Sequence, residues 1–245
     1  MPSQRQKEPL EGKSLYLLIL TAIVQFIYPI SVDASPYIRV GYQGLYLILF
    51  IVGIQLVTTN QRQRAITSTL TALWLILGIF LSFQPQVIWG VLSIYSLAAL
   101  IQILFIIALL QYIFRAPKVT FDVLNAACII YLLLGGAFAP VYGIIETVTW
   151  FPDQVTHAFV DSVHIYEDRI IPWQAFVYYS FSTLTTLGYG ELTPLSYWGR
   201  SVATLEAVVG VLYITIVVAR LVGLYATDTD NFPPATPATD QSNNN

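Results

Sequence analysis

Four stretches of this chain contain no charged residue, and each is long enough for a helix that crosses a membrane. They cover residues 14–32, 40–61, 65–114 and 123–145. A helix needs about 20 apolar residues to cross roughly 30 Å of hydrocarbon. The stretch 65–114 has room for two such helices, and Gln84, Pro85 and Gln86 favour a turn between them because proline cannot continue a helix. The sequence therefore predicts five membrane crossings before residue 146.

A sixth crossing is predicted at residues 199–225, where the only charges are Arg200, Glu206 and Arg220. The composition agrees, because 56% of the residues are hydrophobic and only 10% are charged, against about 25% charged in a soluble domain. The formal net charge of −3 also leaves no basic surface for nucleic acid. We expect an integral membrane protein in contact with lipid, with no nucleic-acid partner.

The basic residues of the short loops predict the orientation, because Lys and Arg gather on the cytoplasmic side of membrane proteins. One side would carry Arg5, Lys7, Lys13, Arg62, Arg64, Arg115 and Lys118. The other would carry Arg39, Arg169 and Arg200, with an acidic loop of Glu146, Asp153, Asp161, Glu167 and Asp168. We therefore expect a multi-pass protein of the cell membrane with both termini in the cytoplasm. The acidic loop would be a hydrated turret, or it would concentrate cations.

Residues 170–190 are also uncharged, but a full crossing there would put the acidic loop and the last helix on conflicting sides. This segment should instead enter and leave by the same face. Pro172 suits the first position of a short helix, which we place at residues 173–185. The irregular backbone that follows can lie at membrane depth only where it is buried in protein or lines a water-filled path.

That backbone runs through Thr185, Thr186, Leu187, Gly188, Tyr189, Gly190 and Glu191. If four copies surround one axis, the carbonyl oxygens of residues 186–189 and the Thr186 hydroxyl can form stacked rings that replace the hydration shell of a cation. Successive carbonyls can point the same way only if alternate residues adopt conformations that a Cβ disfavours. Gly188 and Gly190 fall at that alternation.

The run 185–190, with Pro194 and the sequence Trp198, Gly199, Arg200 behind it, resembles the signature of potassium channels. Residues 182–225 more closely resemble bacterial channels that carry four helices before one pore module. The pattern covers about residues 122–225, whereas the four leading helices match only in number and polarity. The resemblance implies an all-α integral membrane fold: a four-helix, voltage-sensor-like domain, then a pore module of outer helix, re-entrant pore helix, filter and inner helix, assembled as a homotetramer.

The implied function is passive, potassium-selective conduction, with no enzymatic activity, no cofactor besides the permeating K⁺, and no nucleotide-binding domain. The implied K⁺ ligands are Thr186, Leu187, Gly188 and Tyr189, with Gly190 completing the outer end. The implied filter supports are Thr185, Glu191, Tyr178, Tyr179 and Trp173. Leu187 stands where the family usually has Val or Ile, and Glu191 where it has Asp. Neither change touches the carbonyl rings, so potassium selectivity should survive.

Several residues of the last predicted helix are candidates for gating. Gly210 matches the family's gating glycine and is either a hinge or a point of close helix packing. Glu206 is the acidic residue deepest in a span, and it either braces the pore helix or makes gating proton-dependent. A stripe at helical spacing could form an apolar cavity wall, a dewetting gate, or a packing surface. The stripe consists of Val211, Ile214, Val218 and Val222.

A voltage sensor needs several basic residues within the fourth helix, because one charge crossing the field supplies only about 2.3 kcal/mol per 100 mV. Residues 87–114 contain none. The four leading helices would therefore brace the pore, set lipid packing, or hold a site for a modulator. His157 and His164 are seven residues apart in the outer loop, and we expect solvated side chains there rather than a metal site.

The expected domains are a cytoplasmic arm at 1–14, the four-helix domain at 15–115, the pore domain at 120–225 and a disordered tail at 226–245. Within the pore domain, the filter is 186–190 and the inner helix 199–225. Two other functions stay open: a nonselective cation channel and a nonconducting membrane scaffold. A membrane enzyme would need a convergent set of reactive side chains that the spans lack.

Overall fold

The architecture comes from a computed structural model of the chain, which describes residues 12–32, 34–57, 61–83, 87–152, 154–163, 165–166 and 169–229, with side chains through 223. Several sequence predictions lie outside these residues. They concern most of the N-terminal arm, the turn at Gln84, Pro85 and Gln86, the loop residues Asp153, His164, Glu167 and Asp168, and the tail from residue 230.

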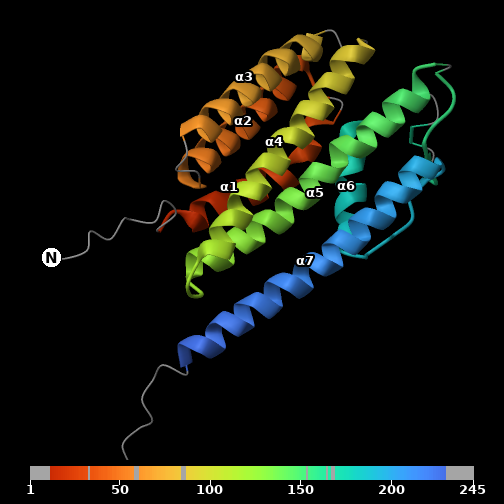
Figure 1. The fold of residues 1–245 in the computed structure, drawn as a ribbon. Helices are drawn as coiled ribbons and strands as arrows, with labels where there is room; N and C mark the ends of the chain where they lie inside the picture. Colours follow the sequence, from red (N-terminus) through yellow and green to blue (C-terminus); the bar gives the residue numbers. More distant parts are fainter. Residues whose placement is uncertain are drawn as a thin grey trace, which may run out of the picture.

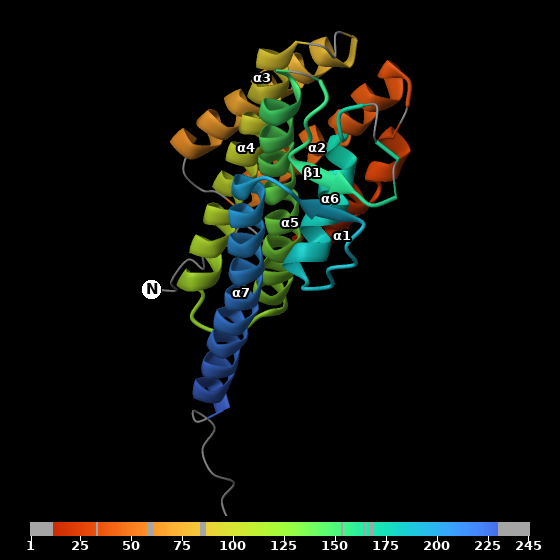
Figure 2. The ribbon, with the colours of Figure 1, turned by 90° about the vertical axis from the view of Figure 1, so that its right-hand side faces the viewer.

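The chain forms a bundle of long helices followed by a helix–loop–helix module. The first part contains α1 (Ser14–Phe26), a 3₁₀ turn (Tyr28–Ser31), α2 (Pro36–Val57), α3 (Gln61–Phe83) and α4 (Ile88–Arg115). The second part contains α5 (Phe121–Trp150), β1 (Phe159–Asp161), α6 (Trp173–Leu184), β2 (Leu192–Pro194) and α7 (Tyr197–Thr229). The short α6 lies beside α5, and α7 runs along α5 with its last turns extending beyond the bundle (Figures 1 and 2).

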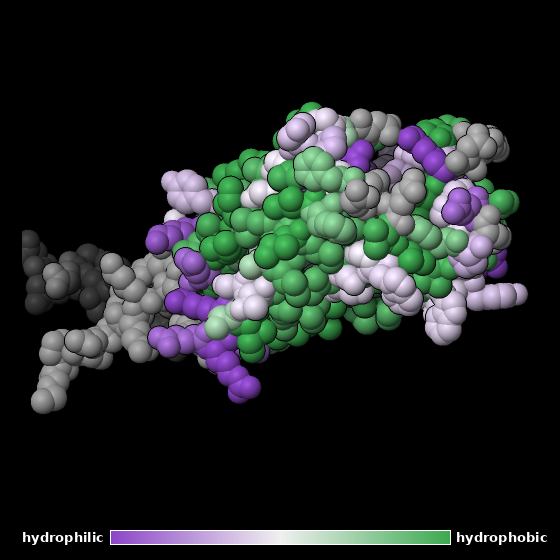
Figure 3. Space-filling view, turned by 90° about the horizontal axis from the view of Figure 1, so that it is seen from above, coloured by the Kyte–Doolittle hydropathy of each residue, from purple (hydrophilic) through white to green (hydrophobic). Residues whose placement is uncertain are grey.

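Among the described residues, five helices are long and apolar enough to cross a membrane: α2, α3, α4, α5 and the part of α7 up to Gly223. Figure 3 shows a wide apolar band between two more polar ends of the molecule. The first uncharged stretch was expected to form a crossing, but its helix α1 has only 13 residues and ends at Phe26, so it is shorter than the other predicted spans. The chain then tightens into the 3₁₀ turn that contains Pro29.

Three further boundaries differ from the sequence predictions. The inner helix starts at Tyr197 and continues to Thr229, so residues 226–229, expected in a disordered tail, are helical. The fifth helix extends to Trp150, past the end of the uncharged stretch. In a chain expected to be all-α, β1 and β2 form a short antiparallel pair in which Phe159 lies opposite Pro194.

Two clusters of buried apolar side chains hold the parts together. The larger cluster joins α1, α2, α4 and α5, with Leu49, Phe50, Phe105 and Leu109 among its least exposed members. The smaller cluster surrounds Tyr142 and joins α5 to β1, α6 and β2. A polar contact also fixes α1 against the start of α5, where the Ser14 hydroxyl donates to Asp122 and accepts from the Asn125 amide. The four-helix part and the helix–loop–helix module are therefore joined by packing on α5.

The packing of α2 on α4 depends on a glycine. A Cβ added to Gly53 would lie 2.2 Å from Cζ of Phe105, whereas a Cβ added to Gly44 on the same helix would meet no atom within 4 Å. We predict that Gly53→Ala lowers the free energy of unfolding by about 1–3 kcal/mol, the usual cost of overpacking. Gly44→Ala should leave it unchanged or raise it by up to about 1 kcal/mol, because alanine favours the helix. Thermal unfolding of detergent-solubilised protein measures both, and equal melting temperatures would contradict this packing.

Candidate functional site

The loop after α6 is fixed to the end of that helix by its own amide groups. The N–H groups of Leu187 and Gly188 donate to the Ser182 carbonyl at 2.8 and 3.2 Å, and the Gly188 N–H also lies 3.1 Å from the Ser182 hydroxyl. The N–H of Thr186 donates to the Thr183 carbonyl at 3.0 Å. These bonds satisfy the last carbonyls of α6, which have no partner within the helix. They also keep the N–H groups of the loop turned toward α6.

The backbone of this loop alternates between two conformations. Thr186, Gly188 and Gly190 have positive φ values of 60°, 57° and 92°, whereas Leu187 and Tyr189 between them do not. Such an alternation lets successive carbonyls face the same way. Among the described residues, no group donates a hydrogen bond to the carbonyls of residues 186–189. Four neighbouring backbone oxygens are therefore available to a cation.

The C-terminal end of the loop is held by the segment that contains β1. The Ser162 N–H donates to the Glu191 carbonyl at 2.7 Å, and the Ser162 hydroxyl lies 3.3 Å from the Gly190 carbonyl. The Tyr178 hydroxyl, from α6, donates to the Glu191 carboxylate at 3.2 Å. Both ends of the candidate filter are therefore fixed by groups outside it.

The other predicted supports lie elsewhere around α6. Trp173 stacks on Tyr42 of α2, with ring centroids 5.4 Å apart, so the start of α6 rests on the four-helix part. Tyr179 is buried and packs edge-on against Tyr142 of α5. Thr185 ends α6, and its hydroxyl donates to the Phe181 carbonyl at 2.7 Å. The two tyrosines thus differ, because only Tyr178 contacts Glu191.

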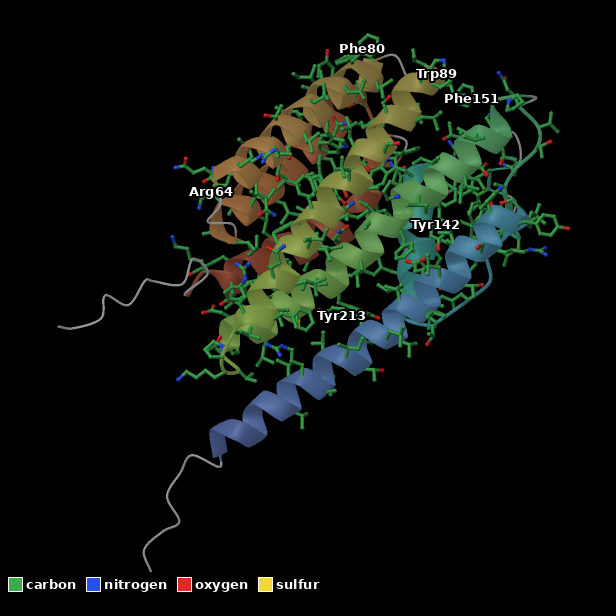
Figure 4. All side chains as sticks on the ribbon, viewed as in Figure 1. Arg64, Phe80, Trp89, Tyr142, Phe151 and Tyr213 are labelled. Carbon is green, nitrogen blue, oxygen red and sulfur yellow. The ribbon has the colours of Figure 1, made fainter. Side chains whose placement is uncertain are left out.

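Glu206 of α7 lies where this helix meets α5 and α6. Its side chain is fully buried, at 0% exposure. The Tyr142 hydroxyl of α5 donates to one of its carboxyl oxygens, and the Ser180 hydroxyl of α6 contacts the other. Figure 4 shows Tyr142 at this level of the molecule, between α5 and α6. These contacts favour the bracing interpretation of Glu206, and its role in proton-dependent gating stays a hypothesis.

The Ser180 hydroxyl contacts two acceptors, which limits how the protons around Glu206 can be arranged. The Ser180 hydroxyl lies 2.6 Å from the Gly135 carbonyl as well as in contact with Glu206. A serine hydroxyl has one proton, so it can donate to only one of these two acceptors. All groups are satisfied if Ser180 donates to Gly135 and a neutral Glu206 donates its own proton to Ser180.

Gly210 lies where α7 touches the end of α6. A Cβ at this position would lie 2.5 Å from the Leu184 carbonyl oxygen, so close packing explains the glycine, and α7 stays helical through it. The stripe of Val211, Ile214, Val218 and Val222 is exposed in the single chain, as is most of α7. Lower on α7, the Tyr213 hydroxyl donates to the Ala127 carbonyl of α5 (Figure 4). An apolar face of this extent needs lipid or protein against it.

Arg220 connects the lower part of α7 to the end of α4. Its guanidinium donates to the carbonyls of Ile113 and Phe114 at 3.3 and 2.8 Å and lies over the Phe114 ring. It therefore satisfies carbonyls at the C-terminal end of α4, where a positive charge is favourable. The basic residue of α4 itself is Arg115, in its last turn, as the sequence predicts.

Sequence reasoning missed a part-buried pair at the C-terminal end of α5. Glu146 was assigned to the acidic loop and His157 to solvent, but Glu146 is 0% exposed and its Oε1 lies 2.6 Å from Nδ1 of His157. The other Glu146 oxygen accepts the Ala158 N–H at 2.9 Å. Asp161 also belongs to the fold of this loop, since it accepts three backbone N–H groups. Only the position of Glu146, one residue past a long apolar stretch, hinted at burial.

A comparison with known protein families matched part of the chain. A family model described as an ion channel matches residues 127–226, which is less than half of the chain but covers most of α5, all of α6 and the loop, and nearly all of α7. No solved structure matched the chain. The match and the five long apolar helices indicate a multi-pass membrane protein with an ion-channel domain.

The geometry around Glu206 generates a test of its role. Glu206→Gln keeps one acceptor and one donor at the carboxyl position, so we predict folded protein whose ion flux depends on pH as the unmodified protein's does. Glu206→Leu leaves the buried Tyr142 hydroxyl without a partner, which costs about 1–3 kcal/mol, whereas the Ser180 hydroxyl keeps the Gly135 carbonyl. Its melting temperature should fall clearly. A flux–pH curve that shifts in Glu206→Gln would support proton-dependent gating instead.

Proposed function

We propose that this protein is a potassium-selective channel in which four identical chains surround one conduction path. One observation carries the proposal: the loop 186–190 has alternating left-handed backbone, its amides are tied to α6, and its four carbonyls have no donor among the described residues. Rings of backbone carbonyls replace the hydration shell of K⁺ in selective filters. Conduction would be passive and need neither a nucleotide nor a cofactor.

The tetramer follows from the number of oxygens that one chain can offer. A single strand contributes one carbonyl at each level and cannot encircle an ion, so several copies are needed. The exposed side chains of Leu187 and Tyr189 and the exposed apolar face of α7 support contacts with other copies. Closed cyclic symmetry is the usual way in which identical chains enclose an axis.

The remaining sequence predictions belong to the same proposal. Both termini would be cytoplasmic and the β1–β2 end extracellular, in the cell membrane, because of the distribution of Lys and Arg. A nonselective cation channel is the nearest alternative, and it would be expected to depart from Gly188, Tyr189 and Gly190. A nonconducting scaffold would not explain the filter-like sequence of residues 185–190.

Substitution in the filter tests the conduction mechanism. An L-residue in the left-handed region costs about 1–2 kcal/mol, and Gly188 has φ of 57°. We predict that Gly188→Ala lowers the K⁺ flux into liposomes by about tenfold or loses the preference for K⁺ over Na⁺, since 1.4 kcal/mol corresponds to tenfold.

The matched control is Gly41→Ala, which adds the same methyl group on α2, where no atom lies within 4 Å. It should leave flux and selectivity unchanged. Both variants must elute as the same oligomer as the unmodified protein. Full K⁺ selectivity and flux in Gly188→Ala would contradict the filter assignment, and absent flux in the unmodified protein would favour the scaffold.

The charge pattern of α4 generates a prediction about voltage. Because α4 has no basic residue before its last turn, we predict that open probability varies little with voltage, well below the steepness of several gating charges per subunit. Arg115→Gln should not change this dependence. Patch-clamp recording of reconstituted protein measures it, and steep opening on depolarisation would show that the field acts on another part of the molecule.

A further inference from the structure

The strand β1 runs beside the segment that follows the candidate filter. β1 pairs antiparallel with β2, and Asp161 lies opposite Leu192, which is only two residues after Gly190. The contact continues past the strand. The Ser162 N–H donates to the Glu191 carbonyl at 2.7 Å, and the Ser162 hydroxyl donates to the Gly190 carbonyl at 3.3 Å. A segment distant in sequence therefore reaches the last carbonyl of the candidate filter.

The two halves of the candidate filter are held by different elements. The first half is held by α6, through amides that donate to Ser182. Among the described residues, Ser162 is the one whose groups donate to the backbone carbonyls of Gly190 and Glu191. Gly190 has φ of 92°, and a Cβ added to it would meet no atom of the described chain within 4 Å. Because glycine can adopt other conformations at little steric cost, the direction of its carbonyl depends on Ser162.

The position of Ser162 is fixed by the carboxylate beside it. The Asp161 carboxylate accepts the N–H groups of Val163, Ile165 and Tyr166 at 3.1, 2.6 and 3.1 Å. Hydrogen bonds to a charged acceptor are about twice as strong as those between neutral groups. These three bonds fold the chain into a tight turn directly after β1. Ser162 lies within this turn, so the same bonds limit its movement.

β1 is itself anchored on α6. Phe159 is only 1% exposed, and its ring centroid lies 5.0 Å from that of Phe176 and 5.4 Å from that of Tyr179. Figure 2 shows β1 beside α6. The Ala158 carbonyl also accepts the two N–H groups that follow β2, at 2.9 and 3.0 Å. The turn after β1 therefore connects the packed interior to the C-terminal end of the candidate filter.

We propose that Asp161 and Ser162 are positioning residues for ion conduction, which keep the peptide units of Gly190 and Glu191 in their conducting arrangement. The inference rests on the proposed function, because it assigns these residues a role in the K⁺ path. Neither side chain contacts the ion. Asp161 acts through the turn that it folds, and Ser162 acts through the two carbonyls to which it donates.

The K⁺ concentration separates this role from a general contribution to stability. A bound ion stabilises the arrangement of the loop that binds it, by mass action. High K⁺ therefore compensates for a weakened attachment of the loop, whereas low K⁺ does not. A variant that merely unfolds more readily would lose channels, but the remaining channels would respond to K⁺ as the unmodified protein does.

Single-channel recording of the full chain in planar bilayers measures this dependence. For Asp161→Ala and Ser162→Ala, we expect the open probability at low millimolar K⁺ to fall about three- to tenfold relative to the unmodified protein. This range corresponds to about 0.6–1.4 kcal/mol, the net value of a typical hydrogen bond. At several hundred millimolar K⁺, the open probability of both variants should return to that of the unmodified protein.

Two control variants match these substitutions. Val163→Ala shortens an exposed side chain in the same turn and keeps the N–H that donates to Asp161. Ser96→Ala removes an exposed serine hydroxyl that donates to the Leu92 carbonyl within α4, away from the loop. Both controls should keep the K⁺ dependence of the unmodified protein.

The outcomes distinguish failure of this inference from failure of the proposed function. If the unmodified protein conducts K⁺ and both variants respond to K⁺ as it does, the positioning role is wrong. An equal loss of open probability at low and high K⁺ would show general destabilisation and would also contradict it. Absence of conduction by the unmodified protein would overturn the proposed function, and this inference with it. If Asp161→Ala does not elute as the same oligomer, Asp161→Asn, which keeps one acceptor oxygen, tests the same contact.

Discussion

The attachment of the loop 186–188 to the end of α6 is the interaction on which the pore module depends. The amides of Leu187 and Gly188 point at Ser182, so the loop cannot turn its carbonyls toward its own helix. This works only if α6 is itself fixed. Glu206 and Tyr142 hold α6 between α7 and α5, while Trp173 seats its other end on Tyr42 of α2. The side chains that fix α6 therefore also keep the loop in place.

The four-helix part contributes to that support, although α4 has no sensor charges. It contacts the later helices at three levels: Trp173 on Tyr42 at the start of α6, Gln102 on the Gly136 carbonyl in the middle, and Arg220 at the C-terminal end of α4. Polar contacts within a low-dielectric interior are costly to break, because no water is present to hydrogen-bond the groups that lose their partner. Movement of α7 relative to α4 would therefore have to release the Arg220 contact.

The parts of this structure that the sequence predicted depend on local rules. The lengths of uncharged stretches predicted the long helices, and Gly188 and Gly190 predicted the alternating backbone of the loop. The missed parts depend on contacts between distant residues. Nothing near Glu146 indicates that His157 returns to it, and nothing near Phe159 indicates that Pro194 lies opposite. The left-handed Thr186 was also missed, because only glycine signals that conformation reliably.

The buried polar residues of this molecule fall into two sets, those with hydrogen-bond partners and those with an unpartnered atom. Gln25, Gln102 and Glu206 each have protein partners, and their contacts join one helix to another. Gln43 and Trp74 each have one buried side-chain atom without a partner in the described part of the chain. In an apolar bundle, a polar side chain without a partner lowers stability and would be replaced by a hydrophobic one unless something compensates it.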